Sequence, residues 1–200
     1  MLNEEELKDI EDFIDESIKD ISDKSNINEK KDLDSLVKTT INIMTPKSKM
    51  ILTGIYDFLK KHTLANDLYN NSSNKADFYR SNFSKQLEDK FTFEIPNDID
   101  IKKYENYSNV IIASGIIAGG IGAIPIRMYT KTLTMPIAIG AIIAFVVYKQ
   151  LKKKQFSKLD EIKKEYLSSV KEAFMQWVKS IDEYYESIIK DFEKGLIKNE

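Results

Sequence analysis

Two apolar runs without charged side chains lie next to each other in an otherwise strongly charged chain. The first extends over residues 110–126 and the second over 133–148, and a short basic loop separates them. No Asp, Glu, Lys or Arg lies between Glu105 and Arg127, or between Lys131 and Lys149. As helices rising about 1.5 Å per residue, both runs cross most of a hydrocarbon core of roughly 30 Å. We therefore expect residues 108–149 to form a hydrophobic two-helix membrane hairpin.

Small residues recur at four-residue spacing within both runs. The first run carries Gly115, Gly119 and Ala123, and the second carries Gly140 and Ala144. Such spacing places small side chains on one helix face and lets two helices approach closely in a membrane. Two interpretations are open: the small faces pack the hairpin against itself, or they bring together two copies of the chain. The first is favoured, because these motifs are common in membrane helices generally.

The loop between the runs has the composition of a tight turn at one membrane face. Pro125 is placed to close the first helix and Pro136 to open the second, because proline is tolerated at a helix start but breaks a helix interior. Arg127 and Lys131 lie between them. These four residues are the predicted hairpin turn.

The distribution of basic residues predicts the orientation of the hairpin. Two basic residues lie in the loop, whereas seven lysines flank the runs, two before the first run and five after the second. The positive-inside bias then places both termini on the cytoplasmic side. The five lysines that follow the second run also suit anionic lipid headgroups, although they fit an ordinary stop-transfer flank equally well. These predicted headgroup lysines are Lys149, Lys152, Lys153, Lys154 and Lys158.

Residues 1–107 show the periodicity of amphipathic helices. The first expected helix carries apolar residues from Leu7 to Ile21, begins with a capping box of Asn3 and Glu6, and is followed by a polar break over residues 22–31. A second is expected over about 33–44, and a third starts with Thr45 as N-cap and Pro46 in its first turn and runs to about residue 69. Phe78, Tyr79, Phe83 and Leu87 mark a fourth helix.

Residues 150–200 show the clearest helical periodicity of the chain. Apolar side chains recur every three or four residues from Phe156 to Phe192 and include Phe174, Trp177 and Ile181. Gly195 is the expected C-terminal stop. We expect this helix to pack back on the N-terminal helices as part of an all-α, elongated antiparallel helical bundle.

Composition and charge exclude several classes of function. The 30 basic and 32 acidic side chains give a net charge of −2 and a pI near 5.7, without the basic footprint of nucleic-acid binding. There is no cysteine, and His62 is the single histidine, which we interpret as a helix-surface residue. No set of acid, base, nucleophile and metal ligands can be assembled. We expect no catalytic residues, no cofactor and no bound metal.

The layout of the chain resembles two kinds of protein. The order of elements is similar to the trunk and membrane tip of bacterial dynamin-like proteins: helices come first, then the 110–148 hairpin, then a long returning helix. The GTPase head and its phosphate-loop motif are missing here, so the resemblance does not imply nucleotide hydrolysis. The second resemblance is to colicin pore-forming domains, which enclose an apolar hairpin in amphipathic helices. There the hairpin lies near the C-terminus, whereas 52 residues follow Tyr148 here.

These patterns predict a function carried out in a membrane. The first hypothesis is an integral membrane anchor or scaffold, with membrane remodelling as a further role. The alternative is a pore-forming or toxin-type effector whose hairpin is shielded in solution and inserts conditionally. The partners expected under both are membrane lipids together with a second copy or a helical partner protein.

Overall fold

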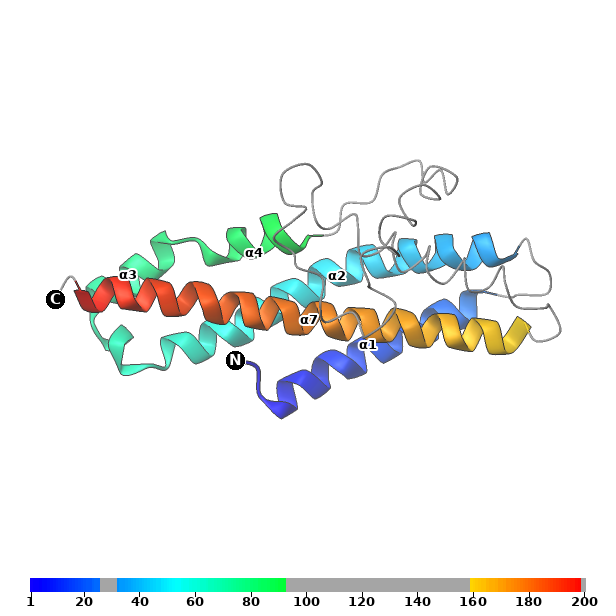
Figure 1. Ribbon diagram of the computed structural model, residues 1–200, viewed down its shortest axis with the longest axis horizontal. Helices are drawn as coiled ribbons and strands as arrows, with labels where there is room; N and C mark the ends of the chain where they lie inside the picture. Colours follow the sequence, from blue (N-terminus) through cyan, green and yellow to red (C-terminus); the bar gives the residue numbers. More distant parts are fainter. Residues whose placement is uncertain (26–31, 93–158, 199–200) are drawn as a thin grey trace, which may run out of the picture.

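The structure, a computed structural model, describes residues 1–25, 32–92 and 159–198 of the chain. Within these residues it is entirely helical, which confirms the all-α prediction (Figure 1). The elements are α1 (Glu4–Lys24), α2 (Asp32–Leu64), the 3-10 helix η1 (Asp67–Asn70), α3 (Ser72–Arg80), α4 (Phe83–Phe91) and α7 (Leu159–Lys198).

The three long helices lie side by side along the long axis of the described structure (Figure 1). Helix α1 is antiparallel to both neighbours, since its start lies near the end of α2 and near Asp182 of α7, whereas its own end lies at Lys163, close to the start of α7. Helices α2 and α7 run parallel, however: Thr63 bonds Tyr185 at one end, and Tyr166 bonds Thr40 near the other. The prediction of an antiparallel bundle is therefore wrong for this pair. The reason is topological, because α3 and α4 turn back before the chain re-enters at the start of α7.

The predicted capping box at the start of α1 is confirmed. The Asn3 side chain accepts a hydrogen bond of 2.9 Å from the Glu6 N–H, and Glu6 accepts one of 3.0 Å from the Asn3 N–H. Two N–H groups that the helix itself cannot pair are thereby satisfied, a gain of about 1 kcal/mol. The first turn is acidic, which complements the positive end of the helix dipole.

Helix α2 is continuous through Pro46, so the predicted break between a second and a third helix is wrong. A proline inside a helix loses one hydrogen bond and costs about 3 kcal/mol. Buried side chains lie on both sides of it, with Met44 before and Ile51 after, and burying each contributes roughly 1.5–3 kcal/mol. The Pro46 ring is exposed, and Thr45 adds a hydroxyl hydrogen bond of 2.7 Å to the carbonyl of Ile41. The continuous helix also ends earlier than predicted, at Leu64.

The single helix predicted around residues 78–87 is two helices, α3 and α4, separated at Asn82. Asn82 has a φ of 49°, in the left-handed region, and interrupts the helix between α3 and α4. In an unbroken helix, Phe78 and Phe83 would point about 140° apart, since each residue turns about 100°. The break lets both rings enter the core, with centroids 5.2 Å apart.

Substitution at Asn82 is expected to show the cost of this conformation. Asn82→Val should lower the free energy of unfolding by about 1–2 kcal/mol, because a β-branched side chain is strained at positive φ. Asn82→Gly, which fits the same φ without strain, is the matched control and should be at least as stable as the original chain. Urea denaturation followed by circular dichroism measures both. Equal losses for the two variants would contradict this account of the turn.

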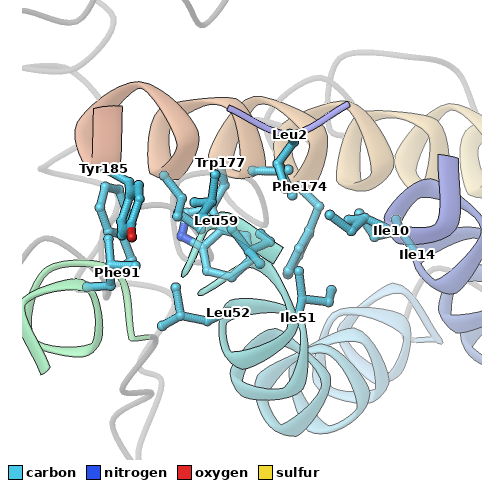
Figure 2. Packing of buried hydrophobic residues seen from close by; sticks show 14 of the residues in the cluster. Leu2, Ile10, Ile14, Ile51, Leu52, Leu59, Phe91, Phe174, Trp177 and Tyr185 are labelled. Carbon is cyan, nitrogen blue, oxygen red and sulfur yellow. The ribbon is translucent and has the colours of Figure 1, made fainter. Parts of the chain in front are cut away.

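Helices α2 and α7 supply most of the buried core residues, and α1 and α4 each pack against both of them. Figure 2 shows Leu2 and Ile10 of the N-terminal segment converging with Phe174 and Trp177 of α7. The predicted stripe of the last helix is confirmed by its buried residues, although Tyr184, Ile188 and Phe192 are only half-buried. The predicted stop at Gly195 is wrong, because α7 continues to Lys198 and keeps Leu196 against the core.

Candidate functional site

Every predicted site residue lies outside the described residues. This holds for the small residues Gly115, Gly119, Ala123, Gly140 and Ala144, for the turn residues Pro125, Arg127, Lys131 and Pro136, and for the headgroup lysines Lys149, Lys152, Lys153, Lys154 and Lys158. Among the helices of the described ranges, none is both long and apolar enough to cross a bilayer. Next to the predicted site, the structure describes the bundle to which the two ends of residues 93–158 are joined.

The first of these ends is the C-terminus of α4, which an aromatic contact fixes to α7. The ring of Tyr184 lies edge-to-face with Phe91, at a centroid distance of 5.6 Å. The Lys90 ammonium lies over the same ring, 3.5 Å from its centroid. Burial lowers the pKa of Lys90. Cation–π and edge-to-face contacts each contribute on the order of 1 kcal/mol. We call Lys90, Phe91 and Tyr184 the α4 end contact.

Removing the Tyr184 ring is expected to loosen α4 selectively. Tyr184→Leu should lower the stability of the α4–α7 contact by about 1–2 kcal/mol, because it deletes both ring interactions while staying apolar. Amide hydrogen exchange should then accelerate over residues 83–91. Tyr184→Phe keeps the ring and serves as control, and α1 supplies an internal reference. Unchanged exchange in α4 with Tyr184→Leu would show that this contact does not hold the helix.

The second end is the start of α7, which is bound to the C-terminus of α1. The Lys163 ammonium donates hydrogen bonds of 2.7 Å and 2.6 Å to the carbonyls of Ser22 and Ser25. A lysine there satisfies carbonyls that the helix leaves free and interacts favourably with the negative end of its dipole. Nearby, the buried Tyr166 hydroxyl bonds Thr40, and burial raises the pKa of Tyr166 to about 12. We call Lys163, Ser22 and Ser25 the α7 start contact.

The two ends of residues 93–158 join the bundle far apart. Phe91 contacts α7 at Tyr184, whereas α7 begins at Leu159, 25 residues earlier in the same helix. At about 1.5 Å per residue this separation is about 37 Å along the helix axis. Any arrangement of residues 93–158 therefore has to bridge that distance.

The start of the chain is held by two carboxylates. His62 Nε2 lies 2.7 Å from Oε1 of Glu6, and Asp182 accepts a hydrogen bond of 3.2 Å from the N–H of Leu2. Burial opposes ionisation of Glu6, but the Asn3 N–H and His62 outweigh it and lower its pKa. Glu6 therefore contributes stability at neutral pH that is lost as the pH falls through its lowered pKa. Burial raises the pKa of Asp182, so its titration acts in the opposite direction.

Lysines of both neighbouring helices bind the acidic surface of α1. The ammonium of Lys171 in α7 lies 2.7 Å from Asp15 and 2.8 Å from Glu11. The hydrogen bond to Asp15 and then that to Glu11 raise the pKa of Lys171. Lys47 of α2 lies 3.3 Å from Asp20. With Lys163, these are the lysine contacts of α1.

Sequence reasoning missed these contacts, apart from placing His62 on a helix surface. Glu6 was singled out only as a capping residue, and no spacing links it to His62, which lies 56 residues further along the chain. Residues 1–25, 32–92 and 159–198 contain no group of histidines and carboxylates able to hold a metal ion. Comparison of the chain with protein-family models, with curated proteins and with solved structures gave no match.

Proposed function

We propose that the chain is an integral membrane anchor or scaffold, in which the helical bundle carries a two-helix hairpin formed by residues 108–149. The observation that carries this proposal is the pair of charge-free runs, 110–126 and 133–148, in a chain where 31% of residues are charged. Each run contains eight Ile, Val, Leu or Phe residues. At about −0.3 to −0.6 kcal/mol each they contribute roughly −2 to −5 kcal/mol of insertion free energy per run.

The described bundle supports this proposal in one respect. Its helices are amphipathic, and 25 apolar side chains are buried among the described residues, so the bundle has a core of its own. In our proposal the bundle lies on the cytoplasmic side with both termini, and the hairpin enters lipid. Packing of the hairpin uses Gly115, Gly119, Ala123, Gly140 and Ala144.

The alternative is a pore-forming or toxin-type effector that inserts conditionally. The observation favouring it is the modest insertion free energy of each run, which glycine and proline reduce further. A hairpin so close to balance can be held in a water-soluble form by other parts of the protein. Membrane remodelling is a further role of the anchor, in which a partner protein supplies any energy.

Fractionation distinguishes the two proposals. An anchor is expected to remain in the membrane pellet after alkaline carbonate extraction from the time of its synthesis. A conditional effector should instead purify without detergent as a monodisperse protein and release dye from liposomes on addition. A soluble monodisperse protein that neither sediments with vesicles nor releases dye would exclude both functions.

A further inference from the structure

One side of α2 faces away from its neighbours α1, α4 and α7. Six residues at spacings of four and three share this side of the helix. Met50, near its centre, is 61% exposed, and Ile43 is half-buried. Lys47 lies at the border with α1, where it contacts Asp20. We call this side the outer face of α2, and its residues are Ile43, Lys47, Met50, Gly54, Asp57 and Lys61.

Gly54 leaves a gap in the outer face. It lies inside α2, where a glycine destabilises the helix relative to an alanine. A Cβ atom at this position would meet nothing within 4 Å, so the described residues give no packing reason for a glycine there. On an exposed helix face, a glycine lets the backbone of a second helix approach closely. The exposed side chain of Met50 lies one turn earlier, and an unbranched methionine adapts well to such a gap.

The charges of the outer face determine how a second copy can meet it. In a parallel pair each position meets itself, so Lys47 would face Lys47 and Asp57 would face Asp57. In an antiparallel pair with Met50 opposite Gly54, Lys47 meets Asp57 of the second copy, and a two-fold axis makes each contact twice. Moving that axis to Gly54 would instead place Lys47 opposite Lys61. Opposite charges therefore favour one orientation and one register.

Both charged partners are available for this contact. The Lys47 ammonium lies 3.3 Å from Asp20, and its side chain remains 21% exposed. A lysine can hold two carboxylates at once, as Lys171 does with two acidic residues of α1. Asp57 is exposed, and within the described ranges it forms no ion pair. A carboxylate and an ammonium are therefore free to meet across the two-fold axis.

We propose that the outer face of α2 is a homodimer interface, in which two bundles meet through antiparallel α2 helices. Met50 of each copy lies in the gap at Gly54 of the other, and Lys47 of each copy meets Asp57 of the other. The interface lies on the bundle and is separate from residues 108–149, so it does not depend on insertion of the hairpin. Because the face is one helix wide, the dimer is weak and concentration-dependent.

The first test measures the mass of the full chain in detergent by sedimentation over a range of concentrations. Gly119→Leu is present throughout, to suppress pairing through the predicted hairpins. Gly54→Leu should weaken dimerisation about tenfold without lowering the thermal midpoint, since leucine favours a helix more than glycine does. Thr53→Leu, at an exposed position beside the outer face, is the matched control and should dimerise like the parent chain. A monomeric parent chain, or a Gly54→Leu dimer as tight as the parent dimer, would overturn the proposal.

The second test uses charge reversal to check the orientation and the register. Lys47→Glu and Asp57→Lys should each weaken dimerisation about tenfold, because each places like charges opposite one another twice. An equal mixture of the two variants should recover the dimer, since they present opposite charges to each other at both contacts. A changed fold in either chain cannot produce this recovery. Lys49→Glu, at an exposed position of α2 outside the outer face, is the control and should not rescue Asp57→Lys. A mixture that stays monomeric would contradict the antiparallel pairing.

Discussion

Lysine at both Ile117 and Ile143 is expected to abolish membrane insertion. Each position lies near the middle of one apolar run, where a lysine costs about 2.5–3.5 kcal/mol on the insertion scale. Within each run this cost is comparable to the roughly −2 to −5 kcal/mol that the apolar side chains of that run supply before glycine and proline reduce it. Insertion of the hairpin should become unfavourable, and the protein should move from the membrane fraction to the carbonate-soluble fraction.

The control for this prediction adds the same charge outside the hydrocarbon region. Thr130→Lys with Thr132→Lys places two lysines in the predicted turn, where headgroups and water can solvate them. This variant should still resist carbonate extraction. If the Ile117→Lys, Ile143→Lys chain also stays in the pellet, attachment does not depend on insertion of the runs, and peripheral binding through lysines becomes the better explanation.

Truncating Leu59 is expected to have the largest effect on the stability of the bundle. Leu59 is fully buried between α2 and α7, and Figure 2 shows it beside Trp177. Leu59→Ala removes apolar contact and leaves a cavity, which typically costs about 2–5 kcal/mol. The free energy of unfolding of a typical domain is roughly 5–15 kcal/mol, so the variant should lose a large part of its stability.

The matched control lies on the same helix. Met50 is 61% exposed, and Met50→Ala should change the free energy of unfolding by less than about 0.5 kcal/mol. Chemical denaturation of both variants, with the midpoint and the slope recorded separately, distinguishes loss of stability from a change in the unfolded state. A similar loss in both would mean that α2 does not pack on α7 through Leu59.

Local sequence signals predicted the existence of helices better than their limits. The capping box of α1 and the apolar stripe of α7 depend on neighbouring residues only, and both are confirmed. Pro46 and Gly195 are ordinary helix terminators, yet both helices continue past them, and side chains beyond them pack on the core: Ile51 is buried and Leu196 is partly buried. Asn82 gave no signal, because the apolar pattern runs through it; the break is decided by where Phe78 and Phe83 can pack.

The candidate site was predictable only in part, for a related reason. The apolar runs are visible in the sequence because insertion depends on the composition of a continuous stretch. The bonds of Lys163 and Lys171 to α1 depend on which helices become neighbours, and their partners lie 138–160 residues away in sequence. Periodicity does not encode such pairings.

The different attachment of the two ends of residues 93–158 has a mechanical consequence. Tension on Leu159 acts along the axis of α7 and loads its contacts with α1 and α2 in shear, over 40 residues at once. Tension on the end of α4 instead peels away a helix of nine residues, one contact after another. In the proposed anchor, a pull from the bilayer would therefore detach α4 first, while α7 stayed packed on α1 and α2.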